Sequence, residues 1–501
     1  MLSSALAGRI ALSIVAVVIA GTIAFALLNL KRGRVDPTEY AIGGRSFGTI
    51  FLWVLLAGEI YTAFTFLGAA GWVYLHGAAA YYIPAYGAIG YLVGYALLPR
   101  IRRLGAERGL VTAPDLLANY YRSPRLGVLA AILYVILALP YVTLQLSGLQ
   151  IVLSSAGYGW LDGAIGAAVA FTAIALFTFT AGLRGTAWAS LVKDGLVLAV
   201  VLFAGIALPI HFFGSLGGMF AQLQRTNAAL LTLPTGDAPF GQVWFITTVL
   251  FTGIGFYMGP HSIAATFSAR SDNTLRRNAM LLPLYSIVLI VIFFAGYAAL
   301  LLVPGLHGHA ADQSFLLVIA RYYPPWVMGF VAGAGALAAL VPSSALILAS
   351  AAIVVRNIVR PAFPGRIDER HETLAMRVAV IAISAAALLA WWLAPETLGS
   401  LLLVYYSGIT QFLPGVVGAA FGLQLRGIAV TLGLAAGVVT AALLTYVLAH
   451  LGFNPGFGGL IANLLVVALV EWLAPKTDGG PRDSSSPTPP RPTVSARRFS
   501  E

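Results

Sequence analysis

The polar residues that could do chemistry in this chain stand inside long apolar segments. Glu59 lies near the middle of TIFLWVLLAGEIYTAFTFLGAAGWVYLHG, with Gly58 before it and Tyr61, Thr62 and Thr65 after it. A carboxylate at mid-depth in a bilayer is costly, and such residues are usually functional. We therefore predict a functional role for Glu59, with a hydrogen bond that merely packs two helices as the alternative.

A second segment, VWFITTVLFTGIGFYMGPHSIAATFSARS, carries Gly253, Gly255, Gly259 and Pro260 within eight positions. Proline removes a backbone donor and kinks a helix, so this segment is also expected to be interrupted. His261 follows directly and would lie beside the freed carbonyl groups. It either contacts a ligand or fills a packing position behind the kink.

The sequence offers no enzyme site. There is no cysteine, so no thiolate nucleophile or thiolate zinc site exists. The seven histidines are scattered and form no HExxH pattern. We predict no catalytic residue, no metal site and no cofactor, and a tail of this length is too short for the signalling domain of a sensor.

The composition is that of a membrane protein. Apolar residues make up 59% of the 501 residues and charged residues 9%, against roughly 45–50% and 25% in soluble proteins. The net charge of +11 does not indicate a nucleic-acid partner, because the charges lie between apolar segments. Lipid, a small solute and a cation are the expected partners.

Thirteen apolar segments are long enough to cross a bilayer as helices, which takes about 20 residues each. They run over residues 8–30, 49–75, 78–98, 126–153, 160–182, 191–214, 243–267, 279–304, 326–355, 375–394, 397–424, 427–450 and 456–474. We predict an all-α polytopic membrane protein with one transport domain, residues 1–475. The Pro/Ser-rich residues 476–501 are expected to form a disordered cytoplasmic tail.

The positive charges fix an expected orientation. Of the 29 Lys and Arg, all but Arg9, Arg225 and Arg321 fall in alternate connections, and Lys193 is counted among these. Such charges are retained on the cytoplasmic side. The N-terminus is therefore expected outside and the C-terminus inside the inner membrane of a bacterium, with no Lys or Arg at mid-depth.

The two interrupted segments are the second and seventh, so they run in opposite directions across the membrane. Interrupted helices at matching positions of two inverted halves mark a transporter whose site lies at the midplane. We predict a 5+5 inverted repeat of helices 2–6 and 7–11 that works by alternating access. A channel is the alternative, since interrupted helices also line pores.

Several stretches resemble the sodium:solute symporter family, which has the leucine-transporter-like fold. They are YAIGGRS (40–46), TAPDLLANYYRSPR (112–125), PYVTLQLSGLQ (140–150), GPHSIAATFSARSDNTLRRNA (259–279) and AALVPSSALILASAAIVVRN (338–357). Together they span most of residues 40–425. The resemblance implies a cation-coupled symporter.

The resemblance also implies an ion site made of backbone carbonyls of the second helix and two adjacent hydroxyls of the ninth. Gly58 and Tyr61 match the carbonyl positions, and Ser343 with Ser344 could supply the hydroxyls. Counted without gaps from the end of the ninth helix, however, the hydroxyl pair falls on 341–342, which are Val and Pro. This departure favours proton exchange at Glu59 as the coupling step, and both Na⁺ and H⁺ remain open.

The Val-Pro-Ser sequence resembles a branch similar to bacterial monocarboxylate permeases, so a small organic acid is the expected solute. Amino acids, urea and other small solutes are alternatives. The candidate solute contacts are Thr62, Gln145, Tyr257 and His261, from helices that face the central site in this fold. Helix N-terminal dipoles or His261 would then have to attract the anion.

Overall fold

The computed structural model describes residues 3–30, 36–58, 60–235, 239–365, 368–393, 396–448 and 452–473. These residues form helices and no β-strand, and the one paired extended site is an isolated bridge between Phe47 and Ala269. The all-helical prediction is confirmed. Glu59 and the predicted tail, 476–501, lie outside the described residues.

Nine helical stretches of the described chain are long and apolar enough to cross a membrane, and a bent pair of helices makes a tenth. They contain α1 (Ser4–Leu28), α7 (Pro124–Ala156), α8 (Gly163–Leu202), α13 (Asp272–Leu302), α15 (Pro325–Ile353), α17 (Glu369–Leu393), α18 (Leu398–Ile409), α20 (Gly427–Tyr446) and α21 (Pro455–Leu473); the bent pair is α11 (Gln242–Gly255) with α12 (Pro260–Ser268). The polytopic character of the chain is thereby confirmed.

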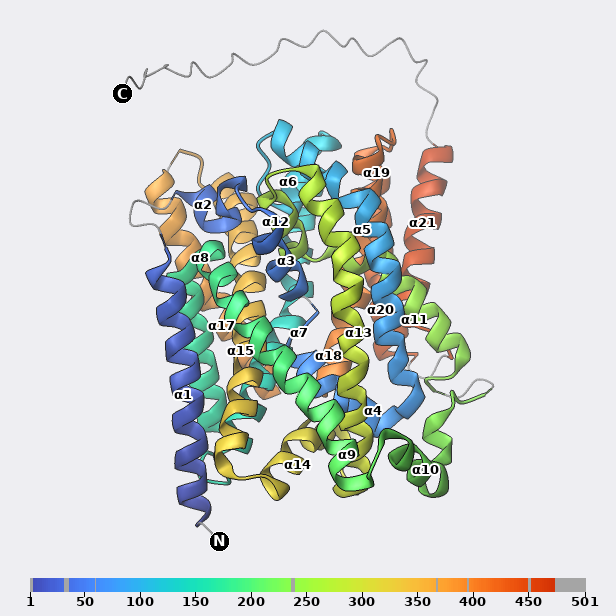
Figure 1. Ribbon diagram of the computed structural model, residues 1–501. Coiled ribbons are helices and arrows are strands. Elements are labelled where there is room, and N and C mark those ends of the chain that lie inside the picture. The colour runs from blue at the N-terminus through green and yellow to red at the C-terminus, as the bar shows by residue number, and fades with distance from the viewer. Residues whose placement is uncertain are drawn as a thin grey trace.

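The helix α8 is divided by Gly182. Its backbone angles there, φ 57° and ψ −173°, are not helical. Only glycine adopts this region readily, because any side chain clashes with the neighbouring backbone. In Figure 1 the ribbon runs toward α2 (Pro37–Ile42) and then turns back toward α9 (Leu208–Phe213). The two limbs correspond to the segments predicted at 160–182 and 191–214.

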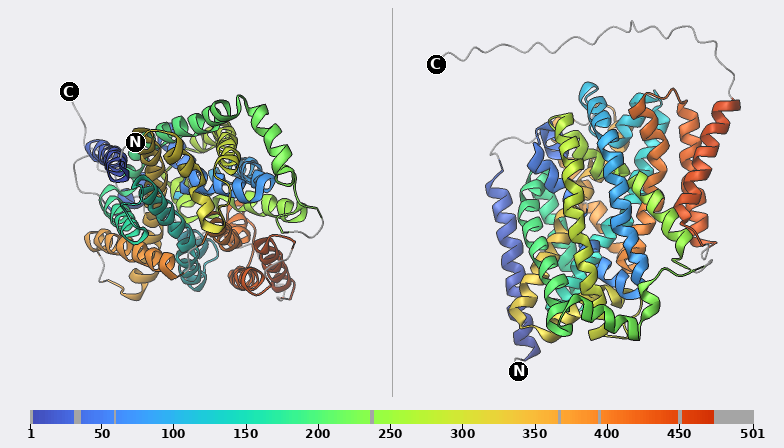
Figure 2. Two further views of the ribbon diagram at one scale, coloured as in Figure 1. Left: turned by 90° about the horizontal axis from the view of Figure 1, so that it is seen from below. Right: turned by 45° about the vertical axis from the view of Figure 1, so that its right-hand side comes forward.

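The helix α15 lies at the centre of the bundle. Of its most apolar window 89% is buried, against 22% for α1, and it packs against α1, α7 and α8. Figure 2 shows α1 and the pair α20–α21 at the periphery of the bundle. The helix α1 begins at one end of the bundle and α21 ends at the other (Figure 1).

Charged contacts gather at the end of the bundle that holds α2. Arg184 pairs with Glu39 at 2.5 Å, and Arg102 pairs with Asp272 at the same distance. The Phe47 bridge lies at this end too and joins the residues before α3 (Thr49–Gly58) to those after α12. Both interrupted segments are thus tied to each other where they leave the bundle.

Candidate functional site

The first interruption follows Gly58, where α3 ends. The chain becomes helical again at Ala63 and continues as η2 (Phe64–Gly68) and α4 (Ala69–His76). Local side chains satisfy the freed backbone groups, as buried peptide groups require. The Thr65 hydroxyl donates to the Ile60 carbonyl, and the Thr62 hydroxyl accepts from the Phe64 N–H at 3.2 Å.

Gln145, on α7, is hydrogen-bonded to the residue at which this segment becomes helical again. Its Oε1 accepts a hydrogen bond from the Ala63 N–H at 3.2 Å. The side chain is fully buried, and its Nε2 has no hydrogen-bond partner among the described residues. A buried amide donor left in this state is unusual, because each such group costs free energy. Gln145 therefore presents a free donor beside the interrupted helix.

The second interruption lies between α11 and α12. After η6 (Phe256–Met258), Gly259 is extended, with φ −62° and ψ 146°, and the two helices are bent by 50°. Pro260 occupies the first turn of α12, where its missing N–H costs nothing. Both predicted interruptions are therefore present.

The two interrupted segments meet in the structure. The helix α12 packs against both α3 and α15. A small cavity of about 10 Å³ lies between them, room for about one water molecule. It is lined by Leu55, Gly58, Thr186, Ser190, His261, Val341, Pro342 and Ala345. Two predicted site residues, Gly58 and His261, are thereby brought together.

Lys193 lies beside the first interruption. Its side chain is fully buried, and Nζ donates to the Tyr61 carbonyl at 3.2 Å. Nζ also pairs with Asp194 Oδ1 at 2.6 Å. A Cβ added to Gly58 would lie 3.5 Å from this Nζ. The ammonium therefore sits against the two residues predicted to hold the cation.

The expectation that Lys193 belongs to a solvated connection is wrong, and so is the expectation that no Lys or Arg lies inside the bundle. The second limb of α8 begins at Gly182 and ends at Leu202, so Lys193 lies inside a helix and not in a connection between helices. A signal was present in the sequence. Thr186, Ser190 and Lys193 follow at helical spacing and share one face.

The two serines of α15 make other contacts. The Ser343 hydroxyl donates to the Leu340 carbonyl at 2.7 Å, and the Ser344 hydroxyl bonds to that of Thr186 at 2.9 Å. Neither serine lines the cavity, whereas Val341 and Pro342 do. Val341 and Pro342, the positions reached by counting without gaps from the end of the ninth helix, are therefore the ones that form the cavity wall.

Two further candidate solute contacts, Tyr257 and His261, have different immediate neighbours. Tyr257 packs against Gly94 of α5 (Tyr82–Glu107) and makes an edge contact with Phe256 at 4.8 Å between ring centres. His261 lies near the rings of Tyr141 and Tyr405, at 5.8 and 6.5 Å. The structure thus groups His261 with an aromatic cluster and Tyr257 with α5.

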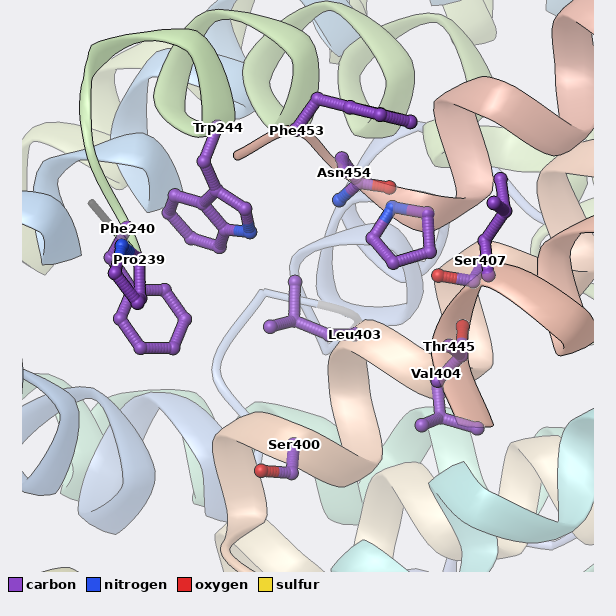
Figure 3. A pocket seen from close by; sticks show the side chains of 12 residues that line it. Pro239, Phe240, Trp244, Ser400, Leu403, Val404, Ser407, Thr445, Phe453 and Asn454 are labelled. Atoms are coloured by element: carbon purple, nitrogen blue, oxygen red, sulfur yellow. The ribbon is translucent and has the colours of Figure 1, made fainter. Parts of the chain in front are cut away.

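A larger cavity of about 400 Å³ lies between α11, α18 and the α20–α21 connection (Figure 3). Aromatic and aliphatic side chains, including Trp244 and Phe240, form most of its wall, and Ser407 and Asn454 add polar groups. Its lining contains no ionisable side chain and none of the predicted site residues. It offers no charge to bind an ion or a carboxylate.

A bundle of apolar helices in which two interrupted segments enclose a buried cavity is the architecture of a membrane transporter. The Sodium:solute symporter family matches residues 40–426. The chain belongs to this family, and it is a cation-coupled symporter and an integral membrane protein.

Relatives agree with this assignment, and a solved structure shares the fold. The uncharacterized symporter YhjB of Bacillus subtilis is 33% identical and covers 92% of this chain and 96% of its own. A monocarboxylate transport permease protein of Rhizobium johnstonii is 29% identical over 70% of each chain. A Na⁺-coupled sialic acid symporter, solved in a substrate-bound outward-open state, has a TM-score of 0.76 over 93% of this chain and 98% of its own, at 17% identity.

Proposed function

We propose that this symporter imports a small monocarboxylate by alternating access, driven by protons. The observation that carries the proposal is the free Nε2 donor of Gln145, fully buried beside the interrupted helix. An anion needs donors that are not already satisfied within the protein. The Rhizobium relative, named for monocarboxylate transport, supports the same solute class.

The proposed binding site adds His261 and Thr62 to Gln145. His261 stands in the first turn of α12, where the helix dipole favours an anion. Thr62 lies next to Ala63, the residue that Gln145 holds. Tyr257 would act as an aromatic gate at the edge of this site.

The proposed topology has thirteen spans. The two limbs of α8 count separately because the chain turns at Gly182, and α3 with α4 and the helix α5 supply further spans. Helices 2–6 and 7–11 would form the 5+5 inverted repeat within the domain 1–475. The N-terminus would lie outside the inner membrane, with the tail 476–501 in the cytoplasm.

Glu59 is the proposed coupling group. It stands between Gly58 and Ile60, at an interruption that abuts the cavity. A carboxylate in such surroundings gains and loses a proton as the site opens to either side. In the alternative, a Na⁺-coupled transporter of an amino acid, urea or another small solute, the hydroxyls of Ser343 and Ser344 and the carbonyls of Gly58 and Tyr61 would hold the ion.

Uptake by proteoliposomes tests the proposal. Labelled pyruvate, lactate and propionate are supplied under an imposed pH gradient, inside alkaline, with proline and urea as competitors. We expect saturable, gradient-driven uptake that only short carboxylates inhibit and that Glu59→Gln uncouples from pH. Uptake that follows a Na⁺ gradient, or that proline or urea inhibits, would support the alternative.

A further inference from the structure

We propose that the ammonium group of Lys193 fills the cation position at the first interruption, so that this symporter binds no Na⁺ there and needs none for transport. The inference builds on the proposed function, since it concerns the cation site of the same transporter. It makes Lys193 a positioning residue: its charge holds the interrupted segment in place of a soluble ion.

The position of Nζ supports this assignment. It donates to the Tyr61 carbonyl at 3.2 Å and lies close to Gly58, the last residue of α3. The carbonyl groups at the end of a helix carry partial negative charge and attract a cation. The ammonium therefore contacts one of the two carbonyls expected to hold a soluble cation, that of Tyr61, and lies beside Gly58, the residue of the other.

The α15 wall of the cavity offers little to a second cation. Na⁺ is a hard ion that requires several oxygen ligands. Across the cavity, Val341 and Pro342 offer no side-chain oxygen. The Ser344 hydroxyl is bonded to that of Thr186. A metal ion at the Tyr61 carbonyl would also have to displace the ammonium, which already donates to that carbonyl at 3.2 Å.

The charge of Lys193 is compensated within the protein. Asp194, almost fully buried, pairs with Nζ at 2.6 Å. A buried charge is tolerated only with such a partner and further hydrogen bonds, and here the Tyr61 carbonyl supplies one. The Lys193–Asp194 pair therefore places an ammonium group at the interruption without adding net charge.

Sodium binding to the purified wild-type protein tests the inference without reference to any solute. We expect no saturable binding of radioactive sodium, and a melting temperature that is the same in NaCl, KCl and choline chloride. A ligand present at a hundred times its Kd would stabilise the fold by about 2.7 kcal/mol, a shift that is easily seen. Saturable sodium binding, or stabilisation by NaCl alone, would overturn the inference.

Chemical rescue then tests the charge itself. Lys193→Ala removes the ammonium but leaves the backbone carbonyls, so uptake should fall at least about tenfold. Added methylammonium should restore a substantial part of it, and choline, which is too large, should not. Arg225→Gln, in an exposed position on α10 (Leu216–Thr226), is the control and should transport normally. Normal uptake by Lys193→Ala would contradict the inference.

The outcomes separate the two proposals. If the wild-type protein takes up no monocarboxylate, the proposed solute fails, whereas sodium binding and melting temperature still decide what fills the cation position. If Lys193→Ala does not fold, the wild-type sodium measurements decide alone. If wild-type uptake is equal in sodium and choline media, the inference is supported whichever solute is carried.

Discussion

The Oε1 atom of Gln145 accepts a hydrogen bond from the Ala63 N–H at 3.2 Å, at the residue where the first interrupted segment becomes helical again. The oxygen of the amide is thereby committed to the backbone, while its nitrogen has no partner in the described chain. One side chain therefore joins the fold of the interruption to the proposed binding of the solute. The two roles use different atoms and can be separated by substitution.

Gln145→Glu should separate them. A carboxylate still accepts from the Ala63 N–H, so the protein should fold and melt near the wild-type temperature. In its ionised form it has no donor and repels an anion, so at a pH where the new carboxyl is ionised uptake of monocarboxylates should fall at least about tenfold. Gln145→Leu should lose both the hydrogen bond to Ala63 and the uptake of monocarboxylates. The unpaired Ala63 N–H should cost about 1–3 kcal/mol of stability. Melting curves and uptake, measured on the same preparations, check this; normal uptake by Gln145→Glu would refute the solute contact.

Gly182 should tolerate no side chain. Its φ of 57° with ψ of −173° lies in a region essentially reserved for glycine, and a Cβ would also come within 3.0 Å of the Tyr40 ring. Gly182→Ala should therefore destabilise the protein by about 1–3 kcal/mol. Gly195→Ala, in the same helix with open space around it, is the matched control and should be neutral or slightly stabilising. Equal melting temperatures for the two variants would argue against the turn in α8.

The sequence predicted the helices and both interruptions because each leaves a local pattern. An apolar run of sufficient length can only be a buried or membrane helix, and Gly259 with Pro260 weakens a helix wherever it is placed. The position of Gln145 next to Ala63 left no such pattern. It depends on how α7 lies against another segment 82 residues away in the chain.

Lys193 shows why charge counting has limits. A Lys and an Asp beside an apolar run look like the solvated end of a helix. In the structure the turn at Gly182 starts the second limb of α8 earlier than the predicted residue 191, and Lys193 is therefore buried within that limb. The pairing of opposite charges on adjacent residues, with Thr186 and Ser190 on the same face, was the available sign of burial. The nearness of Lys193 to Tyr61 follows only from the packing of α8 against α3.

The hydroxyls of Ser343 and Ser344 should be dispensable for transport. The first donates to the Leu340 carbonyl and the second bonds to Thr186. Ser343→Ala and Ser344→Ala should each cost about 1 kcal/mol of stability or less. Uptake should stay within about twofold of wild type, because neither hydroxyl lines the cavity. Uptake measured in sodium and choline media checks this, and a loss specific to sodium medium would favour the Na⁺-coupled alternative.

Asp312 should make stability depend on pH. It lies in the connection between α13 and α14 (Ser314–Tyr322), is 3% exposed, and its Oδ2 accepts from the Leu398 N–H at 2.9 Å. Burial raises the pKa of this carboxyl to about 7, and the hydrogen bond from Leu398 offsets only part of that effect. The folded protein therefore keeps the proton up to about pH 7, whereas the unfolded chain releases it near pH 4. Stability should fall as pH rises from about 4 to 7, and above pH 7 this contribution should be constant.

Asp312→Asn should remove this dependence. The amide keeps an acceptor for the Leu398 N–H but cannot ionise, so the variant should lose less stability than wild type between pH 5 and pH 8. The full difference is bounded by about 4 kcal/mol, from a shift of about three pKa units. Melting curves in detergent at a series of pH values measure it, with Glu107→Gln, an exposed acid on α5, as control. The fall of stability with rising pH arises only from a group that binds its proton more tightly in the folded protein. Parallel pH profiles for Asp312→Asn and wild type would therefore mean that Asp312 is already ionised in the folded protein.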